Sequence, residues 1–154
     1  MIEQPQVTRS HEQHTAVVRL TVPRSEIRNV MGPGLQEIHR VLDEQGVART
    51  GPWCTHHLRM DPEVFDFEIC VPVAAPVRPE GRVQPGELPE RTVARTVHHG
   101  DYERLGAAWG EFEQWVRQSG LRAAPDLWEE YTVGPESSSN PADWRTQLNQ
   151  PLED

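Results

Sequence analysis

The sequence predicts an α+β domain made of two similar halves, each containing a strand, a helix and two further strands. Two segments, 27–45 and 102–119, space their apolar residues as amphipathic helices do. Runs rich in β-branched and aromatic residues lie before and after each helix, with turn residues between them. The order of elements then repeats, and each half closes on a similar tripeptide, Val71-Pro72-Val73 or Gln150-Pro151-Leu152.

Length and charge narrow the class of protein. A chain of 154 residues suits one domain with its own core. Its formal net charge of −9 argues against a nucleic-acid binder, which needs a positive face. No apolar run approaches the roughly 18 residues of a membrane span, and the N-terminus lacks the apolar region of a signal peptide. We therefore expect a cytoplasmic protein that binds neither nucleic acid nor membrane.

The first half contains three strands and an interrupted helix. Residues 1–13 are polar and predict a flexible tail, so the domain is expected to span 14–154. A strand is predicted at 14–23. The helix that follows is predicted to break at Gly32-Pro33, because proline suits the first turn of a new helix, and to end at Gly46. Strands are then predicted at Trp53–Met60 and Val64–Val73.

The second half follows a segment rich in proline and glycine, 74–90, with one short strand predicted at Arg82–Gln84. A strand at Arg91–His98 and a helix from Tyr102 to Ser119 come next. Strands at Leu127–Val133 and Trp144–Leu152 complete the half, on either side of a polar loop.

The repeat assigns equivalent positions to the two halves, about 14–75 and 82–152. Glu129 lies four residues after Pro125, and His56 lies four residues after Pro52. We therefore predict that Glu129 and His56 occupy equivalent places about a pseudo-two-fold axis. Clefts form readily where two similar units meet, so a cleft is expected there.

Four segments resemble the GyrI-like small-molecule-binding domains. TVHHGDYERLGAAW is similar to their "GPYxxL" strand-to-helix junction, with Asp101 in place of proline. PDLWEEYTVGP is similar to their "ExY" strand and NPADWRTQLNQPL to their closing "DWxTxIxxP" strand. GVARTGPWCTHHLRMDPEVFDFEICVPV is similar to the corresponding part of the first half, with His56 where the family has a tyrosine. The resemblance covers roughly residues 15–152.

This resemblance implies a curved antiparallel sheet with two main helices. It also implies the effector-binding role of multidrug-sensing transcription regulators of bacteria, including the ligand domains of AraC-type regulators, here as a stand-alone domain. Ligands of the family are bulky, aromatic and often cationic. Its central ligand contact, the carboxylate of the "ExY" strand, corresponds to Glu129, and its tyrosine corresponds to Tyr131.

The residues themselves suit such a ligand. A carboxylate between bulky aromatics on a strand is costly unless something pairs with it. Glu129 and Tyr131 share one strand face, and Trp128 and Glu130 share the other. Around them we predict ligand-contacting residues in both halves: His56, Trp53, Trp109, Trp144 and Tyr102. A tryptophan on a helical stripe more often belongs to the core, and this alternative stays open for Trp109.

No cofactor or metal site is predicted. Cys54, His56, His57 and Cys70 include typical zinc ligands, but Cys54 and His56 face one side of a strand and His57 the other, without CxxC or HxxxH spacing. We interpret the two cysteines as buried, reduced thiols, with a Cys54–Cys70 bridge as the alternative. Phosphate-binding, dinucleotide-binding and nucleophile-elbow motifs are absent from the sequence.

Three functions are therefore weighed. The first is a binding module for a hydrophobic aromatic, cationic small molecule, with Glu129 as its central polar contact. The second, implied by the resemblance because some stand-alone members of the family act in this way, is a hydrolase that opens cyclopropane rings of electrophilic natural products, with Glu129 as general base and Tyr131 or His56 as its catalytic partner. The third, ranked below both, is a protein that interacts with gyrase through its acidic surface.

Overall fold

The computed structural model describes residues 2–153. The chain divides into two compact units, of which one is residues 11–90. The other combines the N-terminal residues up to Ser10 with the segment from Arg91 onward. Within the described residues there are eight strands and two α-helices, so the α+β class is confirmed.

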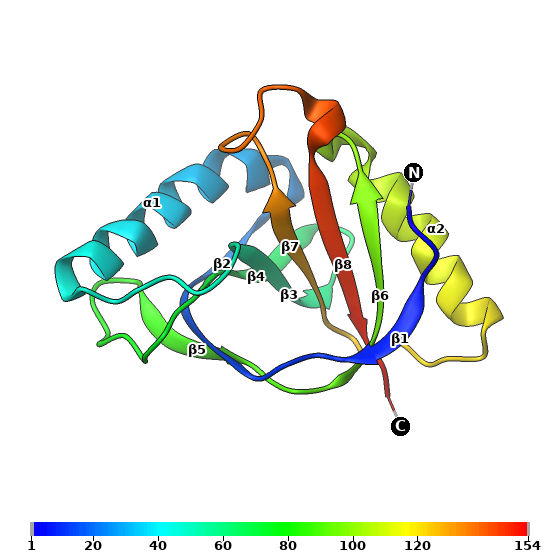
Figure 1. The fold of residues 1–154 in the computed structure, drawn as a ribbon, viewed down its shortest axis with the longest axis horizontal. Helices are drawn as coiled ribbons and strands as arrows, with labels where there is room; N and C mark the ends of the chain where they lie inside the picture. Colours follow the sequence, from blue (N-terminus) through cyan, green and yellow to red (C-terminus); the bar gives the residue numbers. More distant parts are fainter. Residues whose placement is uncertain (1, 154) are drawn as a thin grey trace. The chain divides into compact units, whose positions relative to one another are not determined.

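The unit of residues 11–90 is an antiparallel sheet in the order β3-β4-β2-β5, with a helix on one face (Figure 1). Its elements are β2 (Gln13–Pro23), α1 (Ile27–Gln45), β3 (Cys54–Met60), β4 (Val64–Pro72) and β5 (Gln84–Leu88). A short 3₁₀ turn, Arg24–Glu26, leads into α1. The helix packs against β2 and β4, and fully buried side chains from both layers form the core, among them Ile38, Leu42, Phe67 and Ile69.

Helix α1 differs from its prediction because it is continuous. Pro33 lies inside the helix rather than at the start of a second one. Proline removes one backbone hydrogen bond and crowds the preceding turn, but the adjacent Gly32 and Gly34 have no side chains to add to that crowding. The predicted stop is confirmed: Gly46 takes a left-handed conformation, φ 66°, which glycine adopts without strain.

The second unit is an antiparallel sheet in the order β1-β6-β8-β7 (Figure 1). Its elements are β1 (Gln6–Arg9), β6 (Thr92–His99), α2 (Leu105–Gln118), β7 (Leu127–Val133) and β8 (Arg145–Pro151), with 3₁₀ turns at Tyr102–Arg104 and Pro141–Asp143. Helix α2 packs against β6, and its buried face meets β6 and β8 at Ala94, Ala108, Phe112, Val116 and Leu148.

The two units have the same internal topology, which confirms the repeat. In each, the strand before the helix lies next to the closing strand, which in turn lies next to the strand that follows the helix. Each unit also carries a fourth, edge strand that the repeat did not predict. β1 pairs with β6, and β5 pairs with β2. The structure thus has a strand at 6–9, where a flexible tail was expected, and places the short strand expected at 82–84 at 84–88.

The strand register corrects one predicted equivalence. Pro72 and Pro151 occupy matching positions in the closing strands of the two units. Leu148, three residues before Pro151, lies opposite Glu129 on β7. Ile69, three residues before Pro72, lies opposite Thr55 on β3. Both strand pairs also shift register at the same place, directly after His57 and after Tyr131. Thr55 is therefore the counterpart of Glu129. The predicted equivalence of His56 and Glu129 is wrong, because His56 lies on the other face of its strand.

Two further features concern the chain as a whole. Cys54 and Cys70 lie directly opposite each other on β3 and β4, and both are buried thiols outside any disulfide. Among the described residues, no helix combines the length and the apolar character required to cross a membrane.

Candidate functional site

Glu129 lies in the middle of β7 on the face that α2 covers. Its side chain is buried, 9% exposed. One carboxylate oxygen, Oε1, accepts a hydrogen bond of 2.7 Å from the Tyr131 hydroxyl, two residues along the strand. The other, Oε2, accepts one of 2.6 Å from the indole N–H of Trp109 on α2. Both donors are neutral groups, and together they fix the orientation of the carboxylate.

An aromatic cluster continues from Tyr131. The ring of Tyr102, at the start of α2, contacts Tyr131 edge-to-face at 5.8 Å and tilts against Trp144 at 4.9 Å. Such pairs are favourable beyond the area that they bury, by about 0.5–1.5 kcal/mol each. The Trp144 indole N–H donates to the backbone carbonyl of Ser138, 2.9 Å away, which ties the loop between β7 and β8 to the cluster.

The outer end of the cluster is acidic. Burial, together with the charges of Glu136 and Glu129, raises the pKa of Tyr102 to about 12, so its hydroxyl keeps its proton at physiological pH. Gly134 explains how the loop fits there. A Cβ at position 134 would lie 2.8 Å from the Tyr102 hydroxyl oxygen and about 3 Å from the Glu136 carboxylate, so only glycine leaves room.

Five of the predicted ligand-contacting residues therefore come together in one unit: Tyr102, Trp109, Glu129, Tyr131 and Trp144. Trp109 has both of the roles that the sequence left open, since it donates to Glu129 and also packs against Phe112 at 5.6 Å. Burial differs within the cluster. Glu129 and Tyr131 are buried, whereas the other three are partly exposed.

The remaining two predicted contacts, His56 and Trp53, belong to the other unit. Trp53 is partly buried and packs against the α1 core. His56 Nδ1 lies 3.6 Å from a carboxylate oxygen of Glu68, the residue opposite it on β4. A ligand role for either residue stays a prediction.

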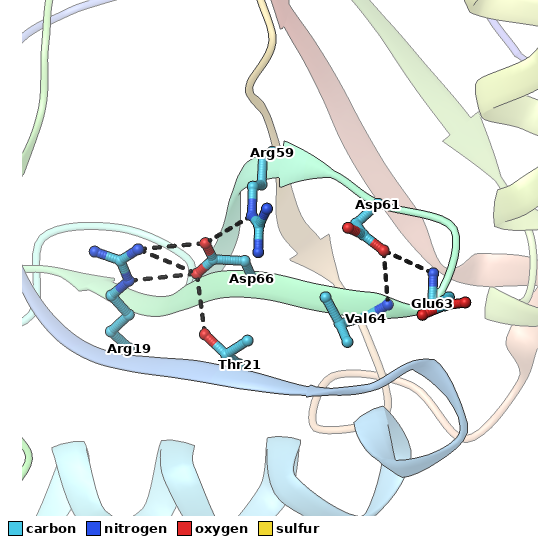
Figure 2. A network of polar contacts seen from close by, with 7 residues as sticks. All are labelled: Arg19, Thr21, Arg59, Asp61, Glu63, Val64 and Asp66. Carbon is cyan, nitrogen blue, oxygen red and sulfur yellow. Dashed lines mark hydrogen bonds and ion pairs between the residues drawn. The ribbon is translucent and has the colours of Figure 1, made fainter.

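A polar network surrounds Asp66 on β4 (Figure 2). Only 6% of the surface of Asp66 is exposed. Arg19, Arg59 and Thr21 donate to its carboxylate at 3.2–3.3 Å, from the strands on either side. Both arginines remain more than half exposed, so Asp66 anchors their charged ends at the surface.

The sequence did not identify a group of buried polar atoms beside Tyr131. Thr146 on β8 lies directly opposite Tyr131, and His98 on β6 lies directly opposite Thr146. Both residues are fully buried. No sequence signal marks this group, because it depends on which strands pair. Within residues 2–153, no group of three His, Cys, Asp or Glu side chains is arranged to hold a metal ion.

Comparisons with known proteins agree with this fold. The family model described as "GyrI-like small molecule binding domain" matches residues 3–153. No curated protein matches the sequence. Among solved structures, the crystal structure of the EcmrR C-terminal domain is similar, with a TM-score of 0.86, 24% identity and 98% of each chain covered.

More distant structures share the fold. SAV2435 bound to tetraphenylphosphonium has a TM-score of 0.71 at 11% identity, over 98% of this chain and 94% of that one. A hydrolase from Listeria innocua has a TM-score of 0.66 at 13% identity, over 97% and 92% of the two chains. The chain spans 57% of EcmrR in the cryo-EM structure of its DNA complex, where it matches with a TM-score of 0.85 at 24% identity and 98% of this chain covered.

Proposed function

Because the chain belongs to the GyrI-like small-molecule binding domain family, we propose that its ligand is an aromatic cation that pairs with the carboxylate of Glu129. The observation that carries this proposal is the pair of neutral donors on Glu129. Trp109 and Tyr131 each donate to one oxygen of this buried carboxylate and hold it at a fixed position. A buried carboxylate so held attracts a cation whose own desolvation is cheap.

The aromatic cluster supplies the second part of the recognition. A delocalised cation stacks on ring faces, and each such contact contributes about 0.5–2 kcal/mol. Tyr102 and Trp144 are partly exposed, so part of each residue reaches solvent. SAV2435, a fold neighbour, binds tetraphenylphosphonium, a cation of this class. That likeness makes tetraphenylphosphonium a suitable first probe for this chain.

The test is a tryptophan-fluorescence titration with tetraphenylphosphonium and with the neutral triphenylphosphine oxide. We expect the wild type to bind the cation more tightly, and Glu129→Gln to weaken cation binding by about tenfold or more, since a charged partner is lost. The affinity of the neutral compound should change little. Thermal unfolding of each variant checks that the fold is retained.

Glu130→Gln is the matched control. Glu130 is the next residue on β7, faces the opposite side and accepts a hydrogen bond of 3.2 Å from Trp128. Its substitution should leave cation binding unchanged. An equal loss of cation affinity in both variants, or no preference of the wild type for the cation over the neutral compound, would contradict the role of Glu129 in binding.

The hydrolase alternative uses the same carboxylate in another role. A general base needs a lone pair directed at the water that it activates. Each oxygen of Glu129 accepts one hydrogen bond from the protein and keeps a second lone pair, so this geometry fits either role. Incubation with a cyclopropane-containing electrophile separates the two roles, because a binding module gives no turnover above the uncatalysed rate. Turnover that disappears in Glu129→Gln would favour the hydrolase instead.

A further inference from the structure

Three buried polar atoms in the unit that contains Tyr131 have no hydrogen-bond partner among the described residues. They are His98 Nδ1, Thr146 Oγ1 and Asp101 Oδ1. Tyr131, Thr146 and His98 are direct neighbours on three adjacent strands, β7, β8 and β6, so their side chains share the face that α2 covers. Buried polar atoms are nearly always paired, so three in one place call for an explanation.

Asp101 is tied to the same place by a hydrogen bond. His98 Nε2 lies 2.9 Å from the backbone carbonyl oxygen of Asp101. Asp101 directly precedes Tyr102, whose ring contacts Tyr131. The three residues that carry the unpaired atoms are therefore each linked to the aromatic cluster, Thr146 through its strand partner Tyr131, His98 through its strand partner Thr146 and Asp101 through its neighbour Tyr102.

All three atoms can accept a hydrogen bond. A carbonyl oxygen only accepts, so His98 Nε2 donates to Asp101, and in the tautomer that carries its proton on Nε2 the other ring nitrogen, Nδ1, is an acceptor. The carboxylate oxygen of Asp101 also accepts, and the Thr146 hydroxyl does either. A group that satisfies all three would have to offer O–H or N–H donors.

We propose that His98, Asp101 and Thr146 form a second, hydrogen-bond-accepting subsite, which selects ligands that carry a hydroxyl or amine in addition to the cationic aromatic part. This inference rests on the proposed function and specifies the ligand class further. The atoms are buried, so a ligand group reaches them only when a covering side chain moves. The partly exposed Tyr102 ring, next to Asp101 and in contact with Tyr131, is placed to make that movement.

An ordered water is the competing explanation. A water bound by two or more of these atoms would satisfy them equally well without any ligand. The two explanations predict different results for Thr146→Val, which removes the hydroxyl and keeps the shape. If a ligand group uses the subsite, the variant loses ligand selectivity and its stability is unchanged or higher, because an unpaired hydroxyl has gone. If a water is bound, the variant is less stable and selectivity is unaffected.

The probes are a matched pair, tetraphenylphosphonium and (4-hydroxyphenyl)triphenylphosphonium, which differ by one hydroxyl group. The wild type is expected to bind the hydroxyl-bearing cation about three- to tenfold more tightly, the range of one neutral hydrogen bond. In Thr146→Val the two affinities should become equal, with the affinity for tetraphenylphosphonium unchanged. Thr132→Val on β7, an exposed threonine that bonds the Arg145 carbonyl, is the control and should keep the preference.

Asp101→Pro is a second variant that does not disturb the core. Asp101 has φ −71° and ψ 166°, which proline adopts readily. Loss of the preference in both Thr146→Val and Asp101→Pro supports the subsite. A preference that survives in both, or is absent from the wild type although tetraphenylphosphonium binds and depends on Glu129, overturns the subsite alone. Failure of the wild type to bind either cation overturns the proposed function and the subsite with it.

Discussion

Glu113 shows how one half-buried carboxylate on α2 affects stability. Its Oε1 atom is buried and has no hydrogen-bond partner among the described residues. Burial raises the pKa of this carboxyl above its ordinary value, and the charge of Arg117, one turn away, opposes the shift only in part. The folded protein therefore binds this proton more tightly than the unfolded chain does.

The raised pKa of Glu113 makes the stability of the protein depend on pH. Below the ordinary pKa of glutamate both states are protonated, and Glu113 costs nothing. As the pH rises from there to the raised pKa, the unfolded state releases the proton first, so the free energy of unfolding falls. We expect Glu113→Gln to be more stable than the wild type at pH 7, by about 1 kcal/mol, and equal to it near pH 3.5.

Urea unfolding of both proteins at the two pH values measures this difference. Glu111→Gln, an exposed position on the same helix, is the control and should change stability by less than about 0.5 kcal/mol at either pH. A stability gain of Glu113→Gln that is the same at pH 3.5 and pH 7 would contradict the pKa argument.

Individual residues were predictable where a local pattern determines their position. The alternation of side chains along a strand placed Glu129 and Tyr131 on one face, and their 2.7 Å hydrogen bond agrees with it. The role of His56 was mispredicted because equivalence between the halves depends on register. A register is set by the partner strand and by the irregularities after His57 and Tyr131, which a single strand's sequence does not reveal.

Helix α1 shows a competition between helix propensity and packing. Gly32 and Gly34 flank Pro33 in the helix, and glycine destabilises a helix by about 1 kcal/mol relative to alanine. The two positions face different surroundings. A Cβ at position 32 would meet nothing within 4 Å, whereas a Cβ at position 34 would lie 2.5 Å from Cδ1 of the fully buried Ile69 on β4.

The two glycines are therefore expected to respond in opposite directions to alanine. Gly32→Ala should raise the free energy of unfolding by up to about 1 kcal/mol. Gly34→Ala should lower it by about 1–3 kcal/mol, since the core around Ile69 is too crowded to absorb a methyl group. Each variant is the control for the other, and denaturant unfolding measures both. Stabilisation by Gly34→Ala would mean that α1 moves away from β4 at little cost.

The sequence predicted where helices and central strands lie because each has a local periodicity. It missed the continuity of α1, since the penalty for an internal proline is outweighed by contacts that form only in the folded unit. The Trp109–Glu129 hydrogen bond could not be predicted from the sequence either, because it depends on how α2 is rotated against β7. Periodicity shows which face of a helix is apolar, but not which side chain on the strand meets it.

At the scale of the molecule, the edge strand of each unit lies outside the half of the sequence that forms the rest of that unit. β1 precedes β2 in sequence but pairs with β6, and β5 precedes β6 but pairs with β2. The duplication was visible in the sequence, whereas these edges were not. β1 is four mostly exposed residues, QVTR, and its partner lies more than 80 residues away, so neither hydrophobic pattern nor local turn chemistry points to the pairing.

The N-terminal segment should therefore be required for the stability of the unit that contains the Glu129 cluster. Besides the β1–β6 ladder, Glu3 donates its backbone N–H to Val97, accepts from the Thr96 hydroxyl and pairs with His99 through its side chain. Ser10, nearly fully buried, exchanges hydrogen bonds with the Arg91 backbone. Deleting residues 2–10 should remove this set of bonds and expose the edge of β6, where unpaired backbone groups promote association.

We expect the deletion to lower the free energy of unfolding by about 2 kcal/mol or more, since several hydrogen bonds of 0.5–1.5 kcal/mol each are lost. Native-state hydrogen exchange locates the effect. Amides of β6 should exchange much faster, while those of β4, in the other unit, serve as an internal reference and should change less. Tetraphenylphosphonium binding should weaken together with the protection of β6, because β6 supports β8 and, through it, the strand that carries Glu129. Unchanged exchange in β6 would mean that the segment is a tail after all, as its polar sequence first indicated.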